Sequence, residues 1–250
     1  MRKDLFTSQI GFSQIYGTPT WVKPRLATGW GIDDMSLYDS ALLKIKELNQ
    51  QKEKWFMTLL TVSTHHPYNV PNVSSTVSFD QALSYADNSV KVFIDALKKN
   101  KTLENTLVII ASDEANGTGD IGFGQGNGGN SNFISDNHGP FVAVGRRILP
   151  RTKQSQVFSQ VDVPATILDY LAVEKNKPIG GRSLFRRYSE PKKVFFGNVY
   201  RDIFGYFQGA EEMVLCNASI ICSLVLLDED SFSSDFFKFI FIKFVTIFIS

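Results

Sequence analysis

The chain has 250 residues and a mass of 28.1 kDa, and its 26 Lys and Arg residues against 25 Asp and Glu give a formal net charge of +1. That length suits one large or two small domains, which would bury about 70–75% of the surface that the unfolded chain exposes. The balanced charge excludes a general nucleic-acid binder, so no nucleic-acid partner is expected, and the 43% hydrophobic content excludes disorder over most of the chain.

The cysteines and the two ends of the chain further limit which class of protein the sequence can encode. Two cysteines, Cys216 and Cys222, exclude a small domain built on several disulfides and a four-cysteine zinc site. Residues 1–20 show no export signal, because polar residues separate their short apolar pairs. Residues 236–249 are rich in Phe but include two lysines, and the run is shorter than the roughly 20 residues of a membrane-spanning helix. We therefore expect no transmembrane segment, and a divergent, apolar tail that is strand-like or interfacial.

Helical spacing of apolar residues alternates with short continuous apolar runs between residues 33 and 199. The spacing predicts helices over 35–48, 79–97 and 162–171. The apolar runs predict strands over 55–62, 106–112, 141–145 and 193–199. Because strands and helices alternate, the sequence predicts an α/β fold with a mostly parallel sheet flanked by helices. Ligands of such sheets bind beyond the carboxyl ends of the strands.

Carboxylates and a histidine follow the strand predicted at 106–112. Asp113 and Glu114 come directly after it, and such a pair supplies ligands for a divalent cation, or one ligand and one general base, or only a loop cap. A Gly-rich segment over 115–132 leads to His138, whose imidazole either returns to the same edge or lies alone on the surface. The chain's three histidines all lie in the two loops expected at this edge, which favours a site there.

A second set of candidates follows the strand predicted at 55–62. His65 and His66 precede Pro67, and their imidazoles could donate to a phosphoryl or sulfuryl oxygen or protonate a leaving group, unless the segment is a structural turn. Trp30, flanked by glycines, can wall a ligand pocket or pack as a satellite core residue. The Gly-rich segment lacks the spacing of a dinucleotide-binding or P-loop motif.

Four passages carry a resemblance to a known family. They are WGIDD at 30–34, THHPY at 64–68, the segment 85–113 that ends in NTLVIIASD, and VDVPATILDYL at 161–171 followed by GGRSL at 180–184. Together they resemble the sulfatase-like branch of the alkaline-phosphatase superfamily, and within it the lipoteichoic-acid-synthase-like phosphoglycerol transferases. The resemblance covers roughly residues 10–200. It implies entry loops at 1–34 that complete the pocket, the carboxyl portion of a sulfatase-like α/β domain at 35–200 and the tail at 201–250, with the N-terminal part of the fold missing.

The resemblance also assigns the metal-binding candidates. The family's strand-end metal aspartate falls on Asp113. Glu114 stands where family members usually have histidine, and a carboxylate there would shift the preference toward harder ions such as Mn²⁺, Mg²⁺ or Ca²⁺. His138 is the other candidate for the second ligand. The implied cofactor is therefore a divalent metal ion.

The substrate-binding candidates follow in the same way. The family's His-x-Pro histidine falls on His65, with His66 as the intervening residue, and its pocket tryptophan on Trp30. The implied substrates are anionic esters, either lipid head groups or sulfated glycans. By family analogy alone, the full-length protein would be associated with the cell membrane or work outside the cytoplasm.

The family's nucleophile is expected upstream of this chain, so no catalytic residue is assigned here. Neither cysteine lies in the sulfatase C/S-x-P-x-R context. We therefore expect the carboxyl part of a metal-dependent sulfatase-like hydrolase or phosphoglycerol transferase that is inactive alone. The alternatives are a phosphatase or phosphodiesterase of the same superfamily, and a non-catalytic domain that binds an anionic ligand.

Overall fold

The computed structural model describes residues 3–17, 22–51, 53–112, 139–149, 156–173, 179–198, 202–209, 212–217, 219–220, 222–226 and 244–249. The chain divides into two compact units. The first comprises residues 1–118, 138–148 and 240–250, and the second comprises residues 119–137 and 149–239.

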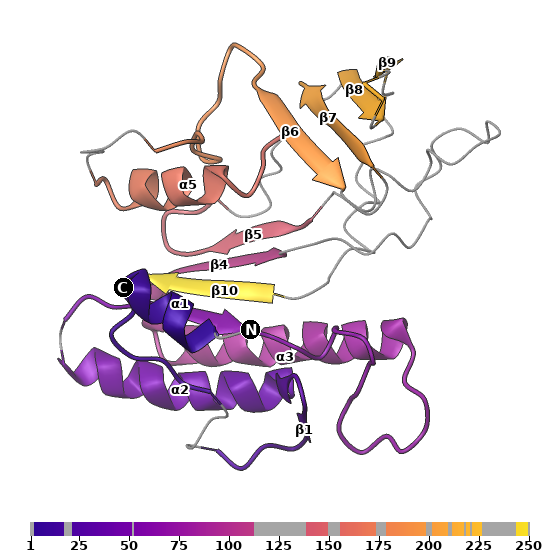
Figure 1. Cartoon of the computed structure of the whole chain (residues 1–250). Helices are drawn as coiled ribbons and strands as arrows, with labels where there is room; N and C mark the ends of the chain where they lie inside the picture. Colours follow the sequence, from indigo (N-terminus) through magenta and orange to yellow (C-terminus); the bar gives the residue numbers. More distant parts are fainter. Residues whose placement is uncertain are drawn as a thin grey trace. The chain divides into compact units, whose positions relative to one another are not determined.

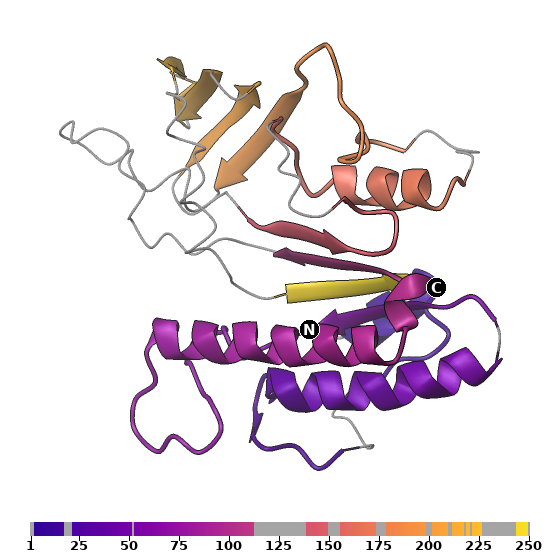
Figure 2. The ribbon, with the colours of Figure 1, turned by 180° about the vertical axis from the view of Figure 1, so that it is seen from behind.

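The first unit is a four-stranded sheet with two long helices on one face (Figures 1 and 2). Its helices are α1 (Lys3–Gln9), α2 (Asp34–Gln51), α3 (Phe79–Lys99) and the short 3-10 helix η1 (Thr102–Glu104). Its sheet has the order β3-β10-β4-β5, formed by β3 (Phe56–Leu60), β10 (Phe244–Ile249), β4 (Leu107–Ser112) and β5 (Phe141–Val144). A separate two-stranded ribbon pairs β1 (Ala27–Thr28) with β2 (Gly31–Ile32).

Local sequence signals explain why α3 begins where it does and which face it buries. The hydroxyl of Ser78 accepts from the backbone N–H of Gln81, and the Gln81 side chain accepts from the Ser78 N–H, which satisfies two donors at the helix start. The apolar face of α3 packs against α2 and the sheet, and Phe93 stacks on Tyr38 of α2 with ring centroids 4.6 Å apart. This shared core fixes the position of the α2 N-terminus, which carries the site described below.

The sheet of the first unit differs in one respect from the expected pairing. Strand β10 runs antiparallel to both β3 and β4, so β3 and β4 are parallel to each other but are not hydrogen-bonded neighbours. Strand β5 pairs antiparallel with β4. Among the described strands the ladders are therefore antiparallel, because a strand from the end of the sequence lies between the two strands that α3 connects.

The second unit contains α5 (Asp162–Tyr170) and an antiparallel sheet of consecutive strands. The strands are β6 (Lys193–Asn198), β7 (Ile203–Gln208), β8 (Glu212–Asn217) and β9 (Cys222–Leu226). Cys216 and Cys222 occupy paired positions of β8 and β9 and form a disulfide. The buried carboxylate of Asp162 accepts from the backbone N–H groups of Ser159 and Arg182, so this acidic residue ties α5 to the loop at 180–184 rather than capping the helix through its own first turn.

The sequence predictions of secondary structure are confirmed for seven elements, namely α2, α3, α5, β3, β4, β5 and β6. The α/β class and the alkaline-phosphatase-like fold are also confirmed. Residues 244–249 form a strand, as the strand-like interpretation of the apolar tail predicts. No helix within the described part of the chain is long and apolar enough to cross a membrane.

Candidate functional site

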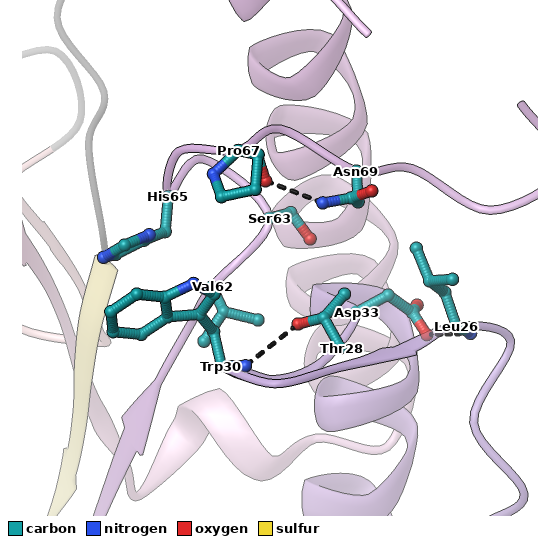
Figure 3. A pocket seen from close by; sticks show the side chains of 9 residues that line it. All are labelled: Leu26, Thr28, Trp30, Asp33, Val62, Ser63, His65, Pro67 and Asn69. Atoms are coloured by element: carbon teal, nitrogen blue, oxygen red, sulfur yellow. Dashed lines mark hydrogen bonds between the residues drawn. The ribbon is translucent and has the colours of Figure 1, made fainter. Parts of the chain in front are cut away.

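Two loops of the first unit meet at the carboxyl end of β3 and form a shallow, open pocket whose enclosed volume is about 10 Å³. One loop is the β1–β2 ribbon with the residues before it, and the other continues from β3 (Figure 3). The lining residues are Leu26, Thr28, Trp30, Asp33, Val62, Ser63, His65, Pro67 and Asn69. The pocket thus joins two of the passages singled out in the sequence, 30–34 and 64–68.

Asp33 fastens the first loop to the start of α2. Its Oδ2 accepts from the Leu26 N–H at 3.0 Å, and its Oδ1 accepts from the Ser36 N–H at 3.0 Å, as an N-cap side chain does. The hydroxyl of Tyr85, on α3, donates to the same Oδ1 at 2.5 Å. Burial alone would raise the pKa of Asp33, but the hydrogen bonds from Tyr85, Ser36 and Leu26 outweigh it and lower the pKa.

Asp34 fastens the second loop to the same helix end. Its Oδ1 accepts from the backbone N–H groups of Val62 and Ser63, each at 2.9 Å, while its own N–H donates to the Ser63 hydroxyl at 3.1 Å. The side chain is fully buried, and its Oδ2 has no hydrogen-bond partner among the residues that the structure describes. Burial raises the pKa of Asp34, and the hydrogen bonds to residues 62 and 63 only partly offset it. Consecutive aspartates therefore hold the two pocket loops in a fixed relation.

The close approach of the two loops depends on a glycine. Gly31 has φ = +149°, and a Cβ at this position would lie 3.3 Å from Cγ1 of Val62. The backbone conformation and the short distance both favour glycine, because a side chain would push the ribbon away from Val62. This packing places the neighbouring Trp30 over the loop that follows β3.

Trp30 and His65 lie against each other at the pocket mouth, with ring centroids 3.9 Å apart and ring planes inclined by 32° (Figure 3). The indole remains 60% exposed, so it covers the imidazole without being a core residue. Nδ1 of His65 lies 2.5 Å from the carbonyl oxygen of His66. A carbonyl only accepts, so Nδ1 carries the proton and Nε2 is the nitrogen that can contact a ligand.

His66 is placed differently from its neighbour. It is exposed, its ring meets Tyr68 edge-on at 5.4 Å, and it is absent from the residues that line the pocket. The His66–Pro67 peptide bond is cis, and the side-chain amide of Asn69 donates to the Pro67 carbonyl oxygen at 2.7 Å. The structure therefore brings Trp30 and His65 together and turns His66 to another side of the loop.

The predicted metal ligands Asp113, Glu114 and His138, and the Gly-rich segment 115–132, lie outside the described residues. Strand β4 ends at Ser112, directly before the first of them. Within the described part of the chain no three His, Cys, Asp or Glu side chains are grouped so that they could hold a metal ion. The pocket itself offers the carboxylate of Asp33, whose two oxygens already accept hydrogen bonds, so these residues do not fit a metal site.

Sequence reasoning missed the residues that hold the pocket together, above all Asp33, Asp34 and Tyr85. The signal for the two aspartates was present, since acidic residues directly before a helical pattern mark a helix start. Nothing in the sequence pairs Tyr85 with Asp33, because the two are 52 positions apart and meet only through the packing of α3 on α2.

The family model described as Sulfatase matches residues 2–173. The chain belongs to the Sulfatase family. Among curated relatives, phosphoglycerol transferase I of Escherichia coli (strain 55989 / EAEC) is 26% identical over 125 residues, and that of Escherichia fergusonii is 28% identical over 127 residues. Each match covers 44% of this chain and 16% of the relative, so the matched region spans about one sixth of those proteins.

Two solved structures share the fold. A protein in the alkaline phosphatase superfamily from Vibrio parahaemolyticus superposes with a TM-score of 0.70 and 22% identity, over 89% of this chain and 53% of that one. The lipoteichoic acid synthase LtaP from Listeria monocytogenes superposes with a TM-score of 0.68 and 17% identity, over 92% of this chain and 62% of that one. This Sulfatase-family chain therefore has the fold of the alkaline-phosphatase superfamily, as the resemblance predicted.

Proposed function

We propose that the pocket between the β1–β2 ribbon and the loop after β3 binds the anionic ester of a phosphoglycerol-type substrate. The observation that supports this most directly is the Trp30–His65 pair at the pocket mouth. A protonated Nε2 would donate a charge-assisted hydrogen bond to a phosphoryl or sulfuryl oxygen, and the indole would shield that bond from water on one side.

The polarity of the pocket supports a phosphoglycerol over a bare anion. His65 lies at one end of the lining, while Asp33, Thr28 and Ser63 supply a carboxylate and hydroxyls at the other. A carboxylate repels an anionic head, so the phosphoryl group would face His65 and the glycerol hydroxyls would face Asp33. Sulfate or inorganic phosphate lacks the hydroxyl-bearing part and would use only half of the pocket.

For the full-length protein we propose a metal-dependent hydrolase or phosphoglycerol transferase of this family. Asp113, with Glu114 or His138 as second ligand, would hold a divalent cation, here Mn²⁺, Mg²⁺ or Ca²⁺, which would stabilise negative charge that develops on the ester. Residues 1–34 would act as entry loops to a sulfatase-like domain at 35–200, with 201–250 as a tail. No nucleophile is assigned among these residues, so the chain would bind without turnover.

We propose further that the full-length protein works outside the cytoplasm, at the cell membrane. The Cys216–Cys222 disulfide supports an oxidising compartment, because structural disulfides are rare in the cytosol. The relatives' names support phosphoglycerol groups as the anionic ester, ahead of sulfated glycans.

Titration of the chain with glycerol 1-phosphate, followed by calorimetry, tests the proposal. We expect binding that weakens at least tenfold in Trp30→Ala and in His65→Ala, and no change in Lys91→Ala, an exposed residue of α3 that serves as matched control. Glycerol should not bind, and inorganic phosphate and sulfate should bind more weakly than glycerol 1-phosphate. Equal affinity in the Trp30 and His65 variants and the unmodified chain would overturn the site. Hydrolysis of p-nitrophenyl phosphate would overturn the absence of turnover.

A further inference from the structure

Positive charge is concentrated in one segment of the second unit, which runs from the loop after α5 to the start of β6. Residues 182–193 contain five Lys and Arg residues against a single carboxylate, Glu190, although the whole chain carries a net charge of only +1. Three of these cations, Arg182, Arg187 and Lys192, line an open groove together with Glu190. The groove has a volume of about 530 Å³, against about 10 Å³ for the pocket beside β3, and it falls within the range of about 300–1,000 Å³ that is typical of small-molecule sites.

The guanidinium of Arg182 is fixed by its surroundings. It lies over the rings of Phe158 and Tyr188, at 5.2 and 4.6 Å from the ring centroids, and its Nη1 donates to the backbone carbonyl oxygen of Glu190 at 3.0 Å. Its Nε is buried and has no hydrogen-bond partner within the described part of the chain. Aromatic rings and a carbonyl oxygen hold the cation without neutralising it, so its charge is left for a ligand.

The backbone that carries the other lining cations is also held in place. The side-chain amide of Gln156 donates to the carbonyl oxygen of Tyr188 at 2.7 Å and accepts from the Tyr188 N–H at 3.3 Å. Further along, Nζ of Lys192 lies 3.2 Å from Oδ1 of the buried Asp162. A ligand therefore need not order this loop, which lowers the cost of binding.

The charge balance of the groove indicates which side chains a ligand would meet. Lys192 shares its charge with Asp162, and Glu190 adds a carboxylate to the lining, so the net attraction for an anion comes from Arg182 and Arg187. The planar fork of a guanidinium matches the oxygens of a phosphoryl group, to which it can donate two parallel hydrogen bonds. Two such groups in a groove of this volume favour a ligand with more than one phosphoryl group over a single phosphate.

We propose that this groove binds an anion with closely spaced phosphoryl groups, which Arg182 and Arg187 hold with support from Lys192. A free diphosphate compound and the phosphate headgroups of an anionic lipid surface present the same oxygens, so the test includes both sources. All the residues that form the groove belong to the second unit, and the proposal does not depend on the pocket beside β3.

Calorimetric titration of the full chain with inorganic pyrophosphate tests the free source. We expect binding that weakens at least fivefold in Arg187→Ala, because this change removes an exposed guanidinium from the lining. Arg186→Ala is the matched control, since it removes the same charge one position away. Arg186 donates to the carboxylate of Asp169 on α5 and does not line the groove, so the affinity should change less than twofold. Equal weakening in the two variants would overturn the site, because net charge alone would then explain the attraction.

Sedimentation of the chain with lipid vesicles tests the headgroup source. Phosphatidylglycerol vesicles should retain the chain, pure phosphatidylcholine vesicles should not, and Arg187→Ala should lower the retained fraction at least twofold. Binding of pyrophosphate without retention on vesicles would assign the groove to a free compound, and retention without pyrophosphate binding would assign it to lipid headgroups. Absence of both would overturn the proposal. His65→Ala should leave pyrophosphate binding unchanged, so a failure of this site can be distinguished from a failure of the pocket beside β3.

Discussion

Replacement of Asp34 by alanine should destabilise the first unit strongly, although Asp34 is not one of the residues that line the pocket. The substitution leaves the buried N–H groups of Val62 and Ser63 without their acceptor, and each such loss costs about 1–3 kcal/mol. Removal of a buried carboxylate whose Oδ2 has no partner in the described part of the chain offsets part of this cost. We therefore expect a net loss of about 2–4 kcal/mol in the free energy of unfolding, which corresponds to a fall of about 5–15 °C in Tm.

Urea unfolding followed by tryptophan fluorescence measures this loss, because Trp21, Trp30 and Trp55 all belong to the first unit. Asp34→Asn keeps an oxygen at the accepting position and should lose less than half as much. Asp95→Ala, on the exposed face of α3, should leave the midpoint unchanged. Unchanged stability in Asp34→Ala, or an equal loss in Asp34→Asn, would refute the role of Oδ1 as the anchor of the loop.

Three further predictions concern glycine, pH and the disulfide. Gly181→Ala should destabilise the second unit by more than about 2 kcal/mol, because Gly181 has φ = +91° and a Cβ there would lie 2.2 Å from the Val161 carbonyl oxygen. Gly180→Ala is the control and should not destabilise the unit, because the space around Gly180 is open. Calorimetric melting compares the two variants. The pKa of Asp33 is lowered in the folded protein, so its ionised carboxylate stabilises the fold above the ordinary aspartate pKa, and this contribution is lost as the pH falls through the lowered pKa. Tyr85→Phe removes one of the hydrogen bonds that lower the pKa, so acid unfolding curves of this variant should show a smaller loss of stability. An unchanged curve would contradict the role of Tyr85. Reduction of the Cys216–Cys222 disulfide should lower the free energy of unfolding of the second unit by about 2 kcal/mol, because the disulfide closes only a short loop. Thermal melts with and without reductant measure this loss, and coincident melts would contradict the prediction.

The fold was predictable where one residue pattern decides one element. The apolar run at 106–112 becomes β4, five of whose six residues are buried, and the helical spacing at 79–97 becomes α3 with a capping box at its start. The direction of strand pairing was not predictable, because the insertion of β10 between β3 and β4 depends on a segment more than 130 residues away from either neighbour. Local periodicity carries no information on which distant strand fills a gap.

The candidate site was predictable only in part, for a related reason. Trp30 and His65 stand out by residue type, and the topology that follows β3 brings them together. Their supports do not stand out, since aspartate at a helix start is common and a tyrosine on an amphipathic helix has no evident partner. Asp33 and Asp34 acquire their roles from tertiary contacts with Tyr85, Val62 and Ser63.

Asp33 and Asp34 both hold the pocket loops in place, and their pKa values shift in opposite directions. Both oxygens of Asp33 accept hydrogen bonds from the protein, and Asp34 accepts at Oδ1 while its Oδ2 is buried. Asp33 stays ionised because donors surround it, whereas burial favours the protonated form of Asp34. We therefore expect an anion in the pocket to contact His65 rather than either aspartate, since Nδ1 of His65 is held by the His66 carbonyl oxygen and Nε2 is left for a ligand.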